Sequence, residues 1–214
     1  MSHKALVFGL QRSGTTFVSK LIKANFDALS RNVDYGPLFW KHRSTRPDKL
    51  PHDVPTFVVF KNPLFWIESV ATRDPRDFYR THPLDFSPDN AKDDVNGCSV
   101  SKLAVFWSDW FTAWVNPYEM KTLPVQYEHL LFPSRLEAFL NIVEKWSGWE
   151  RLHRPAKRPD RVRQSPDYNP AKDDPYYRGE EGLRDLTPKQ VATVLKITKS
   201  RTGKDFSLHA RAQG

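Results

Sequence analysis

The chain has 214 residues, a formal net charge of +8 and one cysteine, Cys98, which excludes an intrachain disulfide. Hydrophobic residues make up 39% of it, enough for a buried core, but no apolar run reaches the roughly 18 residues that a transmembrane helix needs. The basic balance favours anionic partners such as nucleotides or sulfated glycans, although solubility alone explains it equally well. With no recognisable signal peptide, these features predict a cytoplasmic protein with a single domain over residues 1–214.

The first predicted elements are a strand, a glycine loop and a helix. Residues 4–8 form a short apolar run that predicts a buried parallel strand, which ends before a glycine. The hydroxyls of Ser13, Thr15 and Thr16 then offer N-caps for a helix whose apolar residues recur at helical spacing. A phosphate-binding loop occurs in this setting.

The loop itself, residues 9–16, reads G-L-Q-R-S-G-T-T. Its spacing is that of the phosphate-loop motif G-x-x-x-x-G-K-[ST], with Thr15 where the lysine belongs. In ATPases and kinases that lysine reaches the β- and γ-phosphates, so its absence argues against ATP chemistry. The glycine-containing backbone of residues 9–16, which would surround an anion and is called the cradle below, is kept. Arg12 supplies the nearest cation inside this loop.

The next part of the chain predicts two more strands and a helix. Residues 37–41 are a possible second strand, and the T-F-V-V-F run at residues 56–60 is the strongest strand pattern in the chain. Pro63 suits the first turn of a helix over residues 63–72. Residues 73–97, rich in Asp, Pro and Arg, predict a long loop that caps a site.

The second half of the chain continues the alternation. The predicted elements are helices over 101–115, 133–146 and 188–200, the last capped by Thr187, and a strand over 123–127. Residues 151–182 predict a loop or mobile segment, whose basic first part, 151–163, either holds an anionic ligand or is a solvated surface. The whole pattern predicts an α/β fold: a central parallel sheet flanked by helices, with ligands bound beyond the carboxyl ends of its strands.

Two motifs occur together in this order. The first is Q-R-S-G-T-T at residues 11–16, after the opening strand, and the second is Lys61-Asn62-Pro63 followed by Ser69. The pair resembles the motifs of sulfotransferases that use 3′-phosphoadenosine 5′-phosphosulfate (PAPS). The resemblance implies a P-loop NTPase-like sulfotransferase fold, with PAPS as co-substrate, adenosine 3′,5′-bisphosphate (PAP) as product, and no metal.

The resemblance covers about residues 5–146. It continues through Trp107-x-x-Trp110, which resembles the family's tryptophan-bearing helix, and through V-Q-Y-E-H-L at residues 125–130. Helical spacing makes both tryptophans, and Trp114 after them, better candidates for core residues than for ligand contacts. The family's C-terminal Arg-Lys-Gly signature is not present in this chain.

The resemblance also implies roles for the residues of both motifs. The first loop holds the 5′-phosphosulfate through the amides and hydroxyls of Ser13, Gly14, Thr15 and Thr16. Arg12 is both its cation and a catalytic residue, which bridges the donor and leaving oxygens. Lys61 and Ser69 hold the 3′-phosphate, where the family more often has an arginine in place of the lysine. Tyr127 lies either near the adenine or in the core.

Sulfuryl transfer requires a general base for the acceptor hydroxyl. His42 is the first candidate, since it resembles the histidine of the family's Lys-x-His segment and its ordinary pKa suits the task. The alternative is a histidine with only a structural or solvent-facing role. Asp34 and Glu68 are the reserve candidates.

Three functions remain open at this point. The first is a sulfotransferase acting on a hydroxyl or amine of a small-molecule or glycan acceptor. The second is a nucleotide or small-molecule kinase with a degenerate loop. It is disfavoured because Lys61 stands at a strand end where such enzymes place an Asp for Mg²⁺. The third is a non-catalytic module that binds nucleotides or polyanions, with nucleic acid the less expected ligand.

Overall fold

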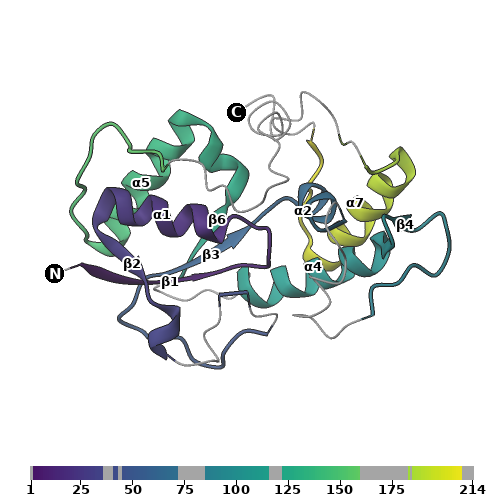
Figure 1. Ribbon diagram of the computed structural model, residues 1–214, viewed down its shortest axis with the longest axis horizontal. Helices are drawn as coiled ribbons and strands as arrows, with labels where there is room; N and C mark the ends of the chain where they lie inside the picture. Colours follow the sequence, from purple (N-terminus) through teal and green to yellow (C-terminus); the bar gives the residue numbers. More distant parts are fainter. Residues whose placement is uncertain are drawn as a thin grey trace. The chain divides into compact units, whose positions relative to one another are not determined.

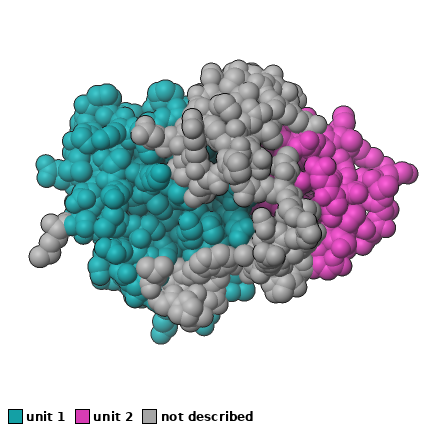
Figure 2. Space-filling model, viewed as in Figure 1, with its two compact units in different colours: residues 1–61, 118–168 teal, residues 62–117, 169–214 magenta. Residues whose placement is uncertain are grey.

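The computed structural model describes residues 2–35, 41–42, 45–71, 85–115, 122–159, 183 and 185–208. The chain forms two compact units, which are described separately (Figure 2). Unit 1 comprises residues 1–61 and 118–168, and unit 2 comprises residues 62–117 and 169–214. The single sulfotransferase-like domain over 1–214 stays a prediction.

Unit 1 contains a parallel sheet with the strand order β2-β1-β3-β6, which confirms the predicted α/β class (Figure 1). Its described elements are β1 (His3–Phe8), α1 (Thr15–Phe26), β2 (Ala28–Ser30), η1 (Asn32–Tyr35), β3 (Thr56–Phe60), β6 (Thr122–Gln126), η3 (Tyr127–Leu131) and α5 (Pro133–Ser147). The strands predicted at 4–8, 56–60 and 123–127 and the helix at 133–146 are thereby confirmed to within two residues.

Helices α1 and α5 lie on the same side of this sheet (Figure 1). Between them and the strands lies one hydrophobic core. It contains Val7 of β1 and Val59 of β3, together with Leu21 of α1 and Leu140 of α5, all of them fully buried. Each such side chain contributes about 1.5–3 kcal/mol relative to an exposed one. Phe8 faces the other side of β1 and is equally buried, as the continuous apolar runs of parallel strands require.

The described part of unit 2 is mainly helical. Its described elements are α2 (Pro63–Ala71), β4 (Asp94–Val95), β5 (Cys98–Ser99), α4 (Val100–Val115) and α7 (Pro188–Thr202). The tryptophans of α4 are at most 2% exposed, which confirms them as core residues. The Trp107 and Phe111 rings both meet the ring of Phe206 edge to face, and the carbonyl of Phe206 accepts a hydrogen bond from the Asn62 side chain.

The element boundaries depart from the sequence expectations in three places. The N-cap of α1 is Gly14 rather than one of the hydroxyl residues, and no side chain caps the helix there. By contrast, Thr187 caps α7 with a capping box that includes Gln190, as its sequence predicts. Strand β2 and the short β4–β5 hairpin were not predicted. Residues 37–40 of the second strand expected over 37–41 lie outside the described residues.

Candidate functional site

The carboxyl edge of the unit 1 sheet contains a topological switch point between β1 and β3. The chain runs from β1 to β2 on one side of β1, and later enters β3 on the other side. The connections that follow β1 and β3 therefore diverge, and open parallel sheets bind ligands at such a point. The phosphate-type loop follows β1 and Lys61 follows β3, so both sequence motifs begin at this edge.

The backbone of the loop turns tightly before α1. Arg12 and Gly14 both adopt left-handed conformations, with φ angles of 71° and 91°. The amide of Ser13 donates to the carbonyl of Leu10 over 3.1 Å, and the Ser13 hydroxyl donates to the same carbonyl. A helix beginning at Thr15 directs its first-turn amides out of its N-terminus, where the helix dipole favours an anion.

Both glycines of the loop lie in crowded surroundings. A Cβ at Gly9 would lie 2.4 Å from the carbonyl oxygen of Val59, on the neighbouring strand β3. A Cβ at Gly14 would lie 2.1 Å from Cδ2 of Tyr127. The glycine spacing of the motif therefore lets the loop approach both β3 and Tyr127, which a side chain at either position would prevent.

His42 is anchored to the first glycine of the loop. Its Nδ1 lies 2.9 Å from the carbonyl oxygen of Gly9, and the amide of Gly9 donates to the carbonyl of Lys41 over 2.9 Å. Because a carbonyl only accepts, Nδ1 carries the proton in this contact, which leaves Nε2 of the neutral ring as a proton acceptor. Burial lowers the pKa of His42 below 6.5, as does Lys41, although the hydrogen bonds to Gly9 and Leu10 oppose the shift.

Lys41 is a residue of this edge that sequence reasoning missed. Its Nζ lies 3.5 Å from the hydroxyl oxygen of Thr16, at the start of α1, and burial lowers its pKa. The residue thus brings an ammonium group to the loop that lacks its own lysine. The sequence holds two indirect signals for it, the absent loop lysine and its place just before His42, but only the fold reveals which lysine approaches the loop.

Lys61 is buried at the end of β3, with 4% of its surface exposed. Burial lowers its pKa from an ordinary 10.5 to about 7, with Glu128 opposing the shift and Arg12 adding to it. Its Nζ lies 5.2 Å from the centroid of the Tyr127 ring. The repulsion between Arg12 and Lys61 means that the cations of the two sequence motifs share this edge of unit 1.

Tyr127 lies between the two motifs. Its ring meets Phe17 of α1 edge to face at 5.7 Å between centroids, in addition to its contacts with Gly14 and Lys61. The Tyr127 ring is therefore packed between the loop, helix α1 and the end of β3. Its proposed place beside an adenine stays a prediction.

Ser69 and Glu68 lie in helix α2, which belongs to unit 2. The Ser69 hydroxyl donates to the carbonyl of Phe65 over 2.7 Å within α2. Glu68 is fully buried, and its carboxylate accepts the amides of Asp185 and Leu186 at 2.9 and 3.3 Å. These contacts give Glu68 a structural role, and the pairing of Ser69 with Lys61 on one phosphate stays a prediction.

The other reserve base, Asp34, lies in η1 of unit 1. Its carboxylate is 35% exposed and lies 4.0 Å from the Arg31 side chain, an ion pair typical of a protein surface. Of the three candidates for the base, His42 is the one whose anchoring to the phosphate-type loop is visible.

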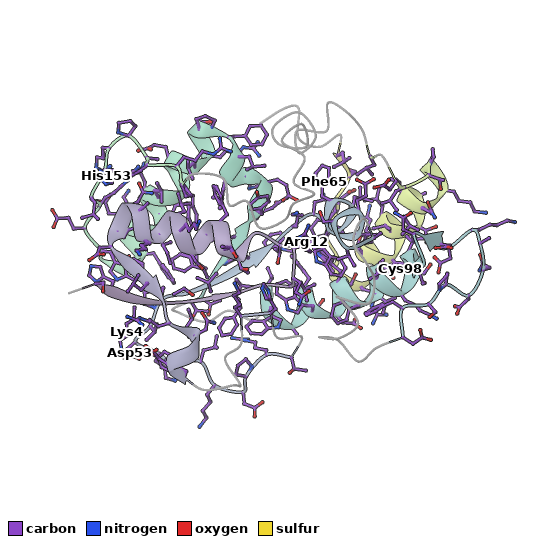
Figure 3. The ribbon with its side chains drawn as sticks, in the orientation of Figure 1. Lys4, Arg12, Asp53, Phe65, Cys98 and His153 are labelled. Carbon is purple, nitrogen blue, oxygen red and sulfur yellow. The ribbon has the colours of Figure 1, made fainter. Side chains whose placement is uncertain are left out.

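The first part of the basic segment lies at the opposite end of α1 from the loop. Asn25, fully buried near the end of α1, bonds the backbone of Lys157 through both atoms of its amide, and its carbonyl accepts the amide of Leu152. Figure 3 shows His153 of this segment far from Arg12. Residues 151–159 therefore do not line the cradle, and residues 160–182 lie outside the described part.

The described residues also bear on metal binding and on membrane insertion. Within the described ranges, no group of three or more His, Cys, Asp or Glu side chains is placed to hold a metal ion. The helices in those ranges lack the length and apolar character that crossing a membrane requires. Comparison of the chain with protein-family models, with curated proteins and with solved structures found no match.

Proposed function

We propose that the protein is a PAPS-dependent sulfotransferase that acts on a hydroxyl or amine of a small-molecule or glycan acceptor. One observation carries the proposal: a phosphate-type loop without its lysine shares the β1–β3 switch point with the buried cation Lys61. A cation at the end of β3 suits a second phosphate group, whereas an ATP-dependent enzyme needs an acidic residue for Mg²⁺. The P-loop-type sulfotransferase fold and a cytoplasmic location are parts of the same proposal.

The loop between β1 and α1 binds the 5′-phosphosulfate. The amides at the start of α1, from Gly14 to Thr16, surround its oxygens, and Arg12 adds a charged donor. Lys41 takes the part of the missing lysine, because its ammonium already lies beside Thr16. Lys61 holds the 3′-phosphate. These donors stabilise the negative charge that develops on the departing phosphate.

His42 accepts the proton of the acceptor. As the acceptor oxygen attacks sulfur, its proton passes to Nε2 of His42, the nitrogen left unprotonated by the contact between Nδ1 and Gly9. The bond between sulfur and the bridging oxygen of the 5′-phosphate breaks in the same displacement, and PAP departs with the electron pair of that bond. The lowered pKa keeps His42 neutral at pH 7, in the form that this step requires.

The proposal is tested by following ³⁵S from labelled PAPS into acceptors of an extract, with the wild type and a His42→Ala variant. We expect the variant to lose at least about 100-fold in turnover, the usual contribution of a general base, and to bind PAP with unchanged affinity. In the wild type, turnover rises with pH through the pKa of His42, which burial lowers, and then levels off.

The matched control is His153→Ala, which removes an exposed histidine at the other end of α1 and leaves turnover unchanged. Near-normal turnover in His42→Ala would reassign the base. Failure of the wild type to label any acceptor, although it binds PAP, would favour the non-catalytic nucleotide-binding module.

A further inference from the structure

Lys61 is buried deeply enough for the loss of water to disfavour its charged form. It lies at the carboxyl end of β3, 4% exposed, where its ammonium has lost nearly all contact with water. Desolvation of an ammonium group costs several kcal/mol unless neighbouring charges and hydrogen bonds offset it. The groups around Lys61 therefore decide whether it carries its proton.

The neighbouring groups come from three elements of unit 1. Glu128 of η3 is fully buried and favours the charged lysine, while Arg12 in the loop opposes it. The face of the Tyr127 ring adds a weak attraction for the ammonium. Across the loop, Lys41 and His42 add a further cation and a ring held neutral by its surroundings. In the ligand-free site, desolvation and Arg12 together outweigh Glu128.

A phosphate anion in the cradle reverses this balance. A phosphate held by Lys61 brings its negative charge beside Nζ, and a second phosphate on the loop adds to it, so both favour the charged lysine far more than the neutral one. We propose that the cradle binds a phosphate dianion together with one proton, which Lys61 takes from the solvent onto Nζ. The choice of nucleotide rests on the proposed function, but the coupling holds for any phosphate that enters the site.

The coupling makes anion binding dependent on pH, with a definite sign. Lys61 of the free protein loses its proton as the pH rises through about 7, whereas the complex retains it. Binding must then recruit a proton, so affinity falls toward a tenfold loss per pH unit above 7. Between pH 6.5 and pH 8.5 the loss is about 25-fold. An arginine at this position stays charged throughout and shows no such loss.

The direct test is NMR of protein labelled with ¹³C at the lysine ε-carbons, titrated between pH 5.5 and 10 without ligand. We expect one resonance, missing from a Lys61→Arg variant, to titrate near pH 7. Saturating PAP, or inorganic pyrophosphate as a probe independent of the nucleotide, then moves its midpoint above pH 9. A midpoint near 10 in the ligand-free protein, or one that neither ligand moves, would overturn the proposal.

Calorimetry supplies the second arm. PAP affinity is measured from pH 6.5 to 8.5 for the wild type, Lys61→Arg and Lys20→Arg, the last replacing an exposed lysine of α1. We expect the 25-fold loss in the wild type and in Lys20→Arg, and its absence in Lys61→Arg; equal losses in all three would contradict the coupling. If pyrophosphate shifts the Lys61 resonance but PAPS transfers nothing, the proposed function fails and the coupling stands.

Discussion

A buried positive charge lies near each end of α1 in unit 1, and the surroundings of the two charges differ. At the end near residues 151–159, the guanidinium of Arg151 is fully buried and lies 2.7 Å from the carboxylate of Glu137 and 2.9 Å from the Asn141 side chain. At the other end, Lys61 is almost as buried, yet its charged form is disfavoured, with Arg12 adding repulsion to desolvation.

The difference separates a structural cation from a binding one. The two terminal nitrogens of Arg151 donate to Asn141 and Glu137, so this side chain fastens the segment after α5 to that helix. At Lys61 the charge of Arg12 is repulsive and only partly offset by Glu128, and the proposed phosphate would offset it further. An arrangement that costs stability without a ligand is typical of sites shaped for function.

The largest effect is expected from Gly14→Ala. The new methyl group would lie 2.1 Å from the Tyr127 ring, at a φ of 91° that also strains alanine. We expect a stability loss of about 3 kcal/mol, from the clash and the strain together, and a loss of PAP affinity of about 100-fold because the loop shifts. Urea unfolding and calorimetry measure the two effects.

Gly148→Ala is the matched control for that variant. Gly148 has a similar φ of 73°, but a Cβ there meets nothing within 4 Å. Only the strain remains, so a loss of about 1 kcal/mol and unchanged PAP affinity are expected. If the two variants behaved alike, crowding at the loop would have no part in the effect.

Arg151→Met should lower the free energy of unfolding, because Glu137 and Asn141 lose the hydrogen bonds of a buried guanidinium, and should leave PAP affinity unchanged. The hydrogen bond from Arg151 lowers the pKa of Glu137 below 4.5. That contribution is present above pH 4.5 and fades as the pH falls through the lowered pKa, so the two proteins should converge in acid. Urea unfolding at pH 7 and pH 3 measures the stability difference between the two proteins. A drop in PAP affinity would contradict the purely structural role of Arg151.

Lys61→Met should have a smaller effect of the opposite sign. Removing a disfavoured cation should stabilise the ligand-free protein by about 2 kcal/mol at pH 6, while PAP binding is lost. The lowered pKa means that the unfolded chain holds more protons than the folded one between pH 7 and 10.5. Wild-type stability therefore rises with pH in this window, and the gain in Lys61→Met shrinks. Destabilisation at pH 6 would show that Lys61 is a structural cation like Arg151.

Much of the fold was predictable because its signals are local. The apolar runs of β1 and β3, the proline that begins α2 and the Thr187 capping box each lie within a few residues. Strand β2 was missed because its three residues carry too short a pattern, and it is defined by its pairing with β1. The hydroxyls around Gly14 misled the cap prediction, since the left-handed turn requires glycine there.

The candidate site was predictable only in part. The loop, Lys61 and His42 follow from motif spacing, and the fold brings all three to one edge of unit 1. The contact of Lys41 with Thr16 joins residues 25 positions apart, and Glu128 acts on Lys61 from another strand connection. Neither has a local signature, because burial and charge coupling exist only once the sheet has formed.

The most direct test of the central claim is a thermal-shift titration of the wild type at pH 7 with PAP and, separately, with Mg-ATP. A cradle with a cation at the end of β3 and no loop lysine predicts that PAP raises the melting temperature in a saturable way, while Mg-ATP has little effect. Stabilisation by Mg-ATP and not by PAP would contradict the account and favour a kinase. Stabilisation only by polyanions, weakened steeply by salt, would contradict it in favour of a polyanion-binding module.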